Sequence, residues 1–337
     1  MHAVLTIVIA FVASAVGTRF LIDWLTARQA VAVENDRTMH SGQVPQGGGA
    51  AVIAAALGTG LVMWPWPAWY SVLIPGAIAL AVMSAINDRR NIAFMWRLGA
   101  HLLAAGLLLV LVPGQTLIFG GLLAFGLDRL IALLALGWFI NLYNFMDGID
   151  GLSGVESMTI ASGTLAVLWR AGVSSPLDGL ALAVLGASAG FLVWNWHKAR
   201  IFLGDVGSIP LGFLMGGLLL YLATNVSLAA AVILPLYYLT DATLTLLGRL
   251  WRGERVWEAH RSHAYQRAAR AVVSHSAVVL RIGACNIVLI GAAVLAVGYP
   301  VFGLAVAVVS VGALMWELER LAASGIMTQP AAIDLRR

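Results

Sequence analysis

The sequence predicts an all-α membrane protein that crosses the bilayer repeatedly, with about 10–11 transmembrane helices. Of its 337 residues, 61% are apolar and only 11% are charged, and the mean hydropathy is +0.90. Soluble domains carry roughly 25% charged residues. Apolar stretches of about 20 residues, long enough to cross the hydrocarbon core as a helix, recur along the whole chain. The alternating segments typical of a membrane β-barrel are missing, so every span is expected to be helical.

Eleven apolar stretches are candidate spans, and ten to twelve is the expected range. The first, MHAVLTIVIAFVASAVG, lacks the basic start and cleavage site of a signal peptide and is retained as a span. The second is short and glycine-rich, and residues 114–128 suit a half-buried loop. The stretches cover residues 3–25, 48–64, 70–87, 97–113, 129–146, 153–170, 177–196, 208–223, 228–250, 276–297 and 299–318. A single integral-membrane domain is expected over residues 1–337, with cytoplasmic loops at about 26–48, 87–97, 146–153, 197–208 and 250–275.

Basic residues predict the orientation, because Lys and Arg near span ends collect on the cytoplasmic side. A periplasmic N-terminus places most of them inside and leaves little beyond Arg129 and Arg170 on the opposite side. The cytoplasmic set comprises Arg28, Arg37, Arg89, Arg90, Arg97, Lys198, Arg200, Arg249, Arg252, Arg255, Arg261, Arg267 and Arg270. This topology and contact with anionic headgroups explain the formal net charge of +4, so the lipid bilayer is an expected partner and nucleic acid is not. Cys285 is the only cysteine, which excludes internal disulfides and a cysteine-built metal site.

Every conspicuous polar cluster falls in an expected cytoplasmic loop. Asp88, Asp147, Asp150 and Asp205 each lie within a few residues of a helix end, beside glycine or asparagine. A solvated acid at a helix end would explain any one of them. Ionisable residues near a bilayer are costly and usually mark a site, so the group on one side predicts a shared polar cavity.

The stretch GDVGS, residues 204–208, predicts a metal site at Asp205. Gly204 and Gly207 let the backbone turn tightly around the aspartate, and Ser208 can cap the helix that follows. Such a helix start offers free N–H groups to an anion, and Mg²⁺ is commonly held by one or two carboxylates together with water and substrate phosphate. A plain glycine-bounded turn is the alternative.

A polar ridge leads out of the span at 129–146, where NLYNFMDGIDG repeats an amide or an acid every three residues. Asn141, Asn144, Asp147 and Asp150 therefore share roughly one helix face. The two amides lie in the last turns of the span and are expected to bond a partner within the bundle, with contacts that hold helices together as the alternative. The two aspartates lie in the glycine-broken exit and are expected to face the cavity.

The last cytoplasmic loop is basic and carries two imidazoles. If it is helical, His260 and His263 share a face, as do Arg252 and Arg255. A basic strip beside an acidic, metal-holding centre suits a pyrophosphate substrate. A lipid-headgroup patch would explain the arginines but not the histidines, and zinc binding by the pair lacks a third ligand at standard spacing.

Motifs spread over most of the chain carry a family resemblance. RTMHSGQVPQGGG, NLYNFMDGIDGLSG, RIFLGDVGSIPLGF and EAHRSHAYQR follow one another between about residues 35 and 270. Together they resemble the polyprenyl-phosphate N-acetylhexosamine-1-phosphate transferases, the multi-span phosphoglycosyl transferases of glycosyl transferase family 4. The form HRSHAYQR resembles the bacterial members that initiate O-antigen or other surface polysaccharides.

The resemblance implies an enzyme of the bacterial inner membrane with its active site at the cytoplasmic face. It implies transfer of an N-acetyl-amino-sugar 1-phosphate from a UDP-sugar to undecaprenyl phosphate, with release of UMP. Mg²⁺ is the implied cofactor, with Mn²⁺ as a substitute. A lipid phosphate oxygen would attack the phosphorus attached to the sugar, while metal and cationic side chains offset the pyrophosphate charge. A homodimer is compatible with the sequence, since lipid-facing and dimer-forming helix faces are equally apolar.

The resemblance also implies roles for single residues. Asp205 corresponds to a magnesium ligand, assisted by Asp147, and the implied catalytic acids are Asp88, Asp147 and Asp150. The implied substrate contacts are Asn141, Asn144, Arg37, His40, Lys198, Arg200, His260, Arg261 and His263. The family often has adjacent histidines in the last loop, so the register of the histidine pair stays open.

One position departs from the family, because Asn87-Asp88 stands where two neighbouring aspartates are usual. An amide cannot act as a base or supply charge to magnesium. Lipid phosphate is already largely ionised near neutral pH, so positioning and charge neutralisation suffice. An active enzyme is therefore expected.

Three alternatives stay open. Within the family, the runner-up is the phospho-N-acetylmuramoyl-pentapeptide transferase of peptidoglycan synthesis. From another class, a lipid-linked-sugar flippase or secondary transporter would place ionisable residues near the bilayer midplane within internal repeats. No repeat is visible here. Arg19 and Asp241, both near predicted span ends, are the residues that would fit this alternative. A catalytically inactive scaffold is the third alternative and draws only on Asn87.

Overall fold

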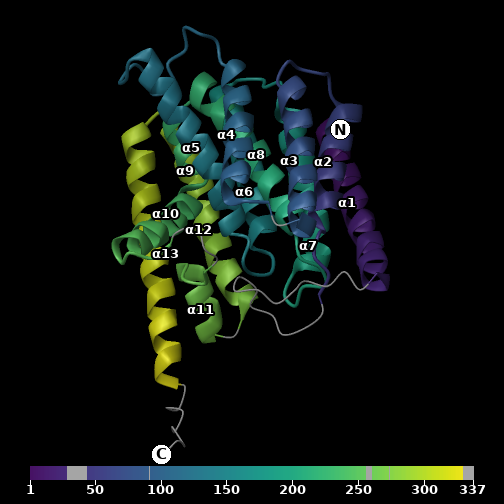
Figure 1. The fold of residues 1–337 in the computed structure, drawn as a ribbon. Coiled ribbons are helices and arrows are strands. Elements are labelled where there is room, and N and C mark those ends of the chain that lie inside the picture. Colours follow the sequence, from purple (N-terminus) through teal and green to yellow (C-terminus); the bar gives the residue numbers. More distant parts are fainter. Residues whose placement is uncertain (29–43, 91, 256–259, 273, 329–337) are drawn as a thin grey trace, which may run out of the picture.

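The computed structural model is helical throughout the part of the chain that it describes, residues 1–28, 44–90, 92–255, 260–272 and 274–328 (Figure 1). Within these residues the only β-type pairing is an isolated bridge between Gln46 and Phe202. The helices are α1 (His2–Ala27), α2 (Gly49–Met63), α3 (Tyr70–Arg90), α4 (Phe94–Val110), α5 (Phe125–Phe145), α6 (Leu152–Ala171), α7 (Asp178–Asn195), α8 (Asp205–Asn225), α9 (Leu228–Ile233), α10 (Leu236–Trp251), α11 (Ala264–Val272), α12 (His275–Ala296) and α13 (Pro300–Thr328). The predicted all-α fold is confirmed.

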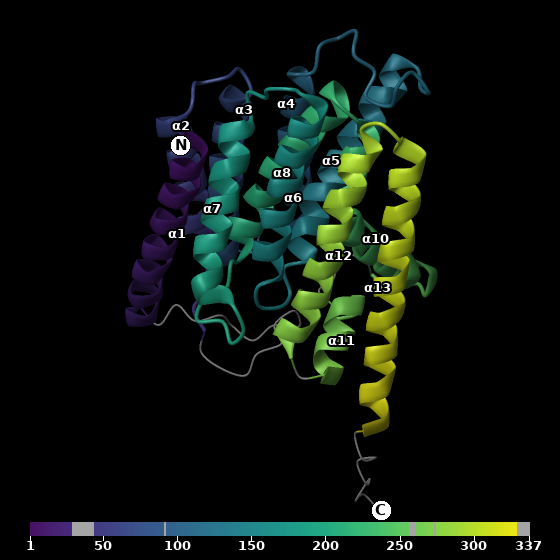
Figure 2. The same cartoon turned by 180° about the vertical axis from the view of Figure 1, so that it is seen from behind.

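Seven of the described helices are long and apolar enough to cross a membrane, judged by length and composition. They are α1, α3, α5, α7, α8, α12 and α13, and α2 and α4 are shorter apolar helices. Figures 1 and 2 show them packed as one bundle, with α1 at one edge and α13 at the opposite edge. The chain is therefore a multi-pass membrane protein.

The most enclosed of these helices is α8. It contacts α2, α3, α4, α5, α6 and α9, and nearly all of it is buried. Glycine permits this packing, because a Cβ on Gly212 would lie only 2.8 Å from the Cβ of Tyr143 on α5. Close backbone approach stabilises helix pairs in lipid, where no hydrophobic driving force acts between them. The start of α8 is consequently held in the middle of one end of the bundle.

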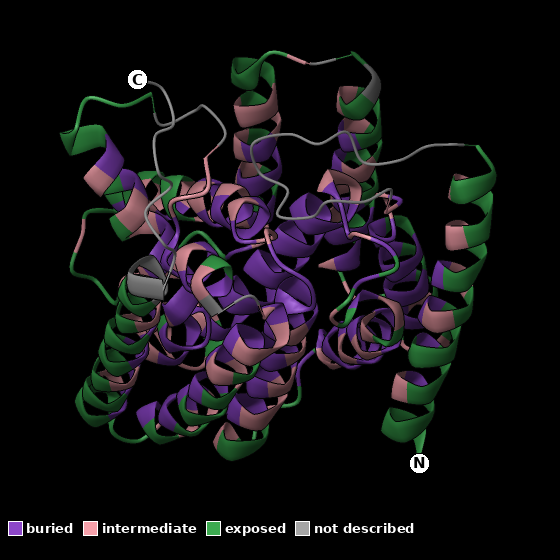
Figure 3. Cartoon of the chain, turned by 90° about the horizontal axis from the view of Figure 1, so that it is seen from below, coloured by how far each residue is buried: buried purple, intermediate pink, exposed green. Residues whose placement is uncertain are grey.

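The outer surface of the bundle is apolar. Val4, Val8, Val12 and Val16 are all exposed on α1 and, spaced by four residues, form one stripe along the helix. Figure 3, which views the bundle from below, shows buried residues at the centre and exposed residues on the outer faces. An exposed apolar stripe of this kind suits contact with lipid.

The expected span at 228–250 is wrong as a single helix, because the chain is divided there into α9 and α10. Pro235 lies between the two; it has no N–H to donate and its ring crowds the preceding turn, which breaks the helix. In Figure 1, α10 lies across the bundle. Leu244, Leu247 and Trp251 are exposed along it. Among the described helices, neither α9 nor α10 belongs to the long apolar set.

The polar loops meet at the lower end of the bundle in Figure 1. This polar end consists of the last turns of α3, α5 and α7, the first turns of α2, α4, α6, α8 and α12, and α11. The expected loops at 87–97, 146–153 and 197–208 all lie there. Arg37 and His40 of the first loop fall outside the described residues.

Candidate active site

A glycine-rich segment positions the start of α8. Residues 47–49 donate backbone hydrogen bonds to the carbonyls of Phe202 and Leu203, at 2.9 to 3.1 Å. A Cβ on Gly49 would lie 2.2 Å from the Cα of Gly207, so the two backbones can meet only because both residues lack a side chain. The residues that follow the first loop thereby hold the turn that leads into α8.

Asp205, the first residue of α8, is bonded on both carboxylate oxygens. The side-chain amide of Asn144 donates to Oδ1 at 2.8 Å, and the guanidinium of Arg97 donates to Oδ2 at 3.2 Å. Gly204 precedes it with φ +73°, in the left-handed region that favours glycine. The predicted aspartate thus has a cation as partner, and that cation, Arg97, was noted in the sequence only as a topology signal.

Ser208 does not cap α8, contrary to the expectation. Its hydroxyl donates to the carbonyl of Gly204 at 3.2 Å and accepts from the amide of Asn144 at 2.9 Å. The cap position is occupied by Gly204 itself, so the serine lies within the first turn and cannot reach the free N–H groups. Asn144 therefore binds both Asp205 and Ser208, which confirms that the polar ridge on α5 bonds within the bundle at this amide.

Asp88 joins this group from the end of α3. The charges of Asp205 and Arg97 both act on its carboxyl group. Its neighbour Asn87 accepts a hydrogen bond from the backbone N–H of Ile92 through Oδ1, at 3.0 Å. The amide therefore holds the turn after α3, and an aspartate at this position could accept the same bond.

Asp147 lies in the connection between α5 and α6. Burial raises the pKa of Asp147 to about 7, aided by the charges of Asp205 and Asp150 and opposed by a hydrogen bond from Ser153 to Oδ1 at 2.7 Å. A nearby divalent cation would favour the charged form. Asp88, Asp147 and Asp205 together offer only oxygen donors, which is the ligand type that Mg²⁺ prefers.

Asp150 is buried in a second cluster with two histidines that the sequence analysis missed. Its Oδ2 lies 2.9 Å from Nδ1 of His197 and 3.3 Å from Nδ1 of His275, and accepts a bond from the backbone N–H of Ala199 at 3.2 Å. The carboxylate oxygen and the two ring nitrogens lie within 4.8 Å of one another. Imidazole suits transition metals better than Mg²⁺, so the candidate magnesium site is the all-oxygen group around Asp205. Here Asp150 ties three segments of the polar end together.

Three other expected substrate residues lie around these clusters. The amide of Asn141 donates to the carbonyl of Gly137 within α5, at 2.8 Å. Lys198 and Arg200 are exposed on the connection between α7 and α8, and the Arg200 guanidinium lies 5.6 Å from the centroid of the Trp194 ring. Two cations thus stand at the solvent side of the polar end, where an anionic ligand can reach them.

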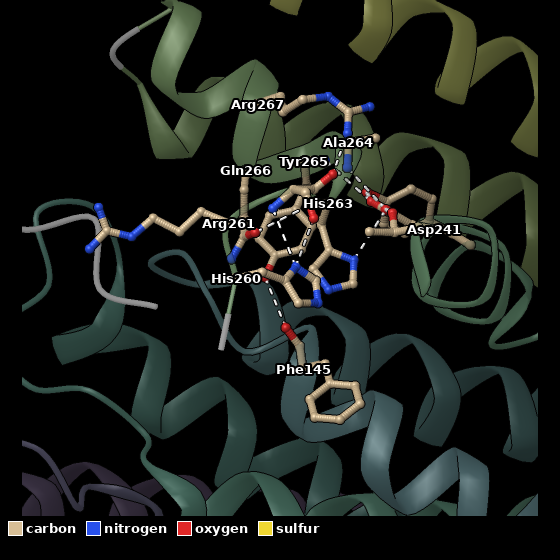
Figure 4. A network of polar contacts seen from close by, with 12 residues as sticks. Phe145, Asp241, His260, Arg261, His263, Ala264, Tyr265, Gln266 and Arg267 are labelled. Atoms are coloured by element: carbon tan, nitrogen blue, oxygen red, sulfur yellow. Dashed lines mark hydrogen bonds and ion pairs between the residues drawn. The ribbon is translucent and has the colours of Figure 1, made fainter. Parts of the chain in front are cut away.

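His260 and His263 reach the polar end from the connection between α10 and α11 (Figure 4). The ring centroids of His260 and His263 lie 4.8 Å apart. His263 is buried, with Nδ1 3.4 Å from Oδ1 of Asp241. The condition for a shared helical face is not met, because α11 begins only at Ala264, yet the two rings are adjacent.

The basic residues of this connection are not aligned on a helix either. α10 ends at Trp251, and Gly253 with φ +73° turns the chain away, so Arg252 and Arg255 share no helical face. The guanidinium of Arg252 donates to Glu254 at 2.6 Å. The carbonyl of Arg261 accepts a hydrogen bond from Arg270 of α11. Part of the basic strip is therefore engaged in shaping the connection.

Comparison with known proteins places this geometry in context. The family model described as glycosyl transferase family 4 matches residues 70–223. A probable undecaprenyl-phosphate N-acetylglucosaminyl 1-phosphate transferase of Bacillus subtilis is 28% identical over 302 residues, which cover 81% of this chain and 80% of the relative. A decaprenyl-phosphate N-acetylglucosaminephosphotransferase of Mycobacterium tuberculosis is 26% identical over 74% of this chain and 72% of the relative. A phospho-N-acetylmuramoyl-pentapeptide-transferase of Mycobacterium leprae is 34% identical, but over only 35% of this chain and 37% of the relative.

Proposed function

This chain belongs to glycosyl transferase family 4, and we propose that it transfers an N-acetyl-amino-sugar 1-phosphate from a UDP-sugar to a polyprenyl phosphate, with UMP as the second product. The observation that carries the proposal is the set of interacting charges at the polar end, where Arg97 pairs with Asp205 and the charge of Asp205 acts on both Asp88 and Asp147. Such a group can hold a divalent cation and a phosphate side by side, which phosphoryl transfer requires.

The residues around Asp205 have different roles in this proposal. Asn144 fixes the orientation of the Asp205 carboxylate and of the first turn of α8. When bound, Mg²⁺ would neutralise charge on the pyrophosphate and on the attacking phosphate. Arg97 adds a guanidinium at the same place, whose planar donor set matches phosphate oxygens. The charges of Asp205 and Arg97 both act on Asp88, which is suited to position the lipid phosphate.

The cationic residues around the rim complete the substrate site. In this proposal Lys198, Arg200, Arg261 and the pair His260 and His263 contact the nucleotide and the pyrophosphate. Arg37 and His40 of the first loop, which lie outside the described residues, are proposed as further substrate contacts. Exposed cations on the α7–α8 connection and adjacent imidazole rings support these roles. Positively charged side chains from several loops would in this way offset the negative charge of the UDP-sugar.

The finer assignment is N-acetylglucosamine as the sugar and undecaprenyl phosphate as the acceptor, in the step that initiates O-antigen or another surface polysaccharide. The relatives named for N-acetylglucosamine align with about three quarters or more of the chain, whereas the muramoyl-pentapeptide relative aligns with about a third. The same proposal places the protein in the bacterial inner membrane with the polar end in the cytoplasm.

Arg19 and Asp241 are the two residues that favoured a transporter. Their observed contacts support the proposal of an enzyme instead. Arg19 pairs with Asp23 one turn away on the exposed side of α1, at 2.6 Å. Asp241 accepts hydrogen bonds from the backbone N–H groups of Ala264 and Tyr265, at 3.0 and 3.2 Å. Arg19 thus has a partner on its own helix, and Asp241 binds the start of α11, in the segment that carries the histidines.

The test is release of UMP by purified protein in detergent, with a panel of UDP-amino sugars, polyprenyl phosphate and Mg²⁺. Activity that needs both lipid and metal, and that Asp205→Asn abolishes, supports the proposal. Asp23→Asn is the matched control, because it removes an exposed carboxylate whose ion-pair partner in the described part of the chain is Arg19, and it should keep wild-type activity. Lipid binding by a folded protein that releases no UMP from any donor would contradict the proposal.

A further inference from the structure

Asp241 is a buried carboxylate with an unusual concentration of hydrogen-bond donors. Its side chain is fully buried in α10. From its own helix, the hydroxyl of Tyr237 donates to Oδ2 at 3.0 Å and that of Thr245 donates to Oδ1 at 3.1 Å. The buried carboxylate is thus heavily hydrogen-bonded, as a buried acid must be if its desolvation is to be offset.

The remaining donors to Asp241 come from the start of α11 (Figure 4). The backbone N–H of Ala264 donates to Oδ1 at 3.0 Å and that of Tyr265 donates to Oδ2 at 3.2 Å, from residues 23 and 24 positions later in the chain. Nδ1 of His263 lies 3.4 Å from Oδ1. The first N–H groups of a helix need an acceptor, which a serine, threonine, asparagine or aspartate before the helix usually supplies. His263 stands there instead, so Asp241 supplies the missing cap from the preceding helix, α10.

The start of α11 is in direct contact with the loop that carries Asp147. The hydroxyl of Tyr265 donates to the carbonyl of Phe145, the last residue of α5, at 3.1 Å. A Cβ on Gly148 would lie 2.2 Å from that hydroxyl oxygen, so the loop and the tyrosine are in close contact. A displacement of the start of α11 would therefore shift both the histidine pair and the connection between α5 and α6.

We propose that Asp241 is a positioning residue for the transfer reaction: it caps α11 from α10 and thereby holds the histidine pair and Tyr265 against the loop of Asp147. The inference rests on the proposed function. Asp241 has no place among the groups that touch substrate, and it acts through the geometry of two loops. Misplacement of reacting groups by about 1 Å can cost on the order of 100-fold in rate, so loss of this cap should lower turnover strongly.

The experiment compares Asp241→Asn with Asp128→Asn. Asp128 is the matched control: it is also fully buried and accepts two backbone N–H groups, of Ile118 and Phe119 at 3.1 and 2.9 Å, but it stands at the start of α5, away from the polar end. At equal folded fraction, Asp241→Asn should lower kcat for UMP release by about 10- to 100-fold. Asp128→Asn should keep the kcat of the wild type, and Asp241→Glu should restore part of the loss. An equal loss in both aspartate-to-asparagine variants would overturn the inference, since general instability would then explain it.

A second readout does not depend on catalysis. Diethyl pyrocarbonate modifies accessible histidines, and mass spectrometry reports the rate at His263, which is buried in the intact protein. Asp241→Asn should raise this rate several-fold and leave the rate at the distant His2 unchanged. Unchanged protection of His263 overturns the inference. If the wild type releases no UMP, the proposed function fails, while this labelling still decides whether Asp241 anchors the segment.

Tyr265→Phe keeps the test decisive if Asp241→Asn does not fold. It removes only the hydroxyl that bonds the carbonyl of Phe145 and leaves the cap of Asp241 in place. The expected result is a several-fold fall in kcat with little change in KM for the UDP-sugar, because the alignment of the loops is altered rather than the affinity. A wild-type kcat in a folded Tyr265→Phe protein would overturn the inference.

Discussion

Replacement of Gly49 by alanine should separate the first loop from the start of α8. The new Cβ would lie 2.2 Å from the Cα and 2.6 Å from the N of Gly207, and 2.9 Å from the carbonyl oxygen of Leu203. All of these are backbone atoms, so no side-chain rotation can relieve the clash. Carbon atoms pack at about 3.5 Å or more, so the two segments must part by about 1.3 Å.

That separation has a stability cost and a catalytic cost. Overpacking of a tight contact destabilises by roughly 1–3 kcal/mol, and the hydrogen bonds from residues 47–49 to Phe202 and Leu203 would be stretched as well. Asp205 lies between Leu203 and Gly207, which both take part in this contact, and a shift of about 1 Å can cost on the order of 100-fold in rate. We therefore expect Gly49→Ala to lower UMP release by at least about tenfold even where the protein stays folded.

The matched control is Gly58→Ala in the same helix, α2. A Cβ at Gly58 meets nothing within 4 Å. Alanine should be neutral there or stabilise the helix by up to about 1 kcal/mol. Thermal unfolding in detergent and the rate of UMP release are measured for both variants. Wild-type turnover and stability in Gly49→Ala would refute the reasoning.

Three further predictions concern the polar end. Asn144→Ala removes the donor to both Asp205 and Ser208, so we expect UMP release to fall by about 10- to 100-fold with a higher Mg²⁺ requirement, and an unchanged Mg²⁺ titration would count against this. Because burial raises the pKa of Asp147 to about 7, its carboxylate must lose a proton before it can bind a cation; the apparent affinity for Mg²⁺ should rise from pH 6 to pH 8, and Asp147→Asn should flatten that dependence. The wild type should turn over with Asn87 in place, and Asn87→Asp should fold normally because its carboxylate can accept the bond from Ile92; complete inactivity of the wild type with rescue by Asn87→Asp would contradict this.

The helical membrane fold was predictable because hydropathy alone reports it. Apolar segments of spanning length cannot satisfy their backbone groups in lipid except as helices, and the structure confirms the all-α fold. The break at Pro235 was missed because the span was assigned from hydropathy, which does not register that a proline inside an apolar stretch breaks a helix. The position of α10, with Leu244, Leu247 and Trp251 exposed, depends on how the helices pack. Hydropathy does not encode that packing.

The local motifs predicted the acids at the polar end, and long-range contacts account for what was missed. Asp205 and Asn144 stand in tight sequence motifs and do meet in space. His197 and His275 have no motif spacing to Asp150, and only the fold brings the three together. The same is true of Asp241, since the N–H groups that it caps lie more than twenty residues further along the chain. Sequence separation of this kind carries no periodic signal.

Some expectations failed for local reasons that can be named. Ser208 was expected as a helix cap, but Gly204 takes that position and the hydroxyl turns to its carbonyl. The histidine pair would share a helical face only if its segment were helical, but α11 starts after it, and the two rings are adjacent in a non-helical segment. In both cases the backbone conformation depends on where the helix begins, which the local sequence did not reveal.

The central claim is that sugar and phosphate move together, and one isotope measurement tests it most directly. The donor is UDP-N-acetylglucosamine with radioactive phosphorus in the β-phosphate, incubated with the protein, undecaprenyl phosphate and Mg²⁺. The account predicts that the label enters the lipid fraction and that unlabelled UMP is released, and that Asp205→Asn abolishes both. Label that stays in the aqueous phase as UDP, while the sugar alone reaches the lipid, would contradict the account.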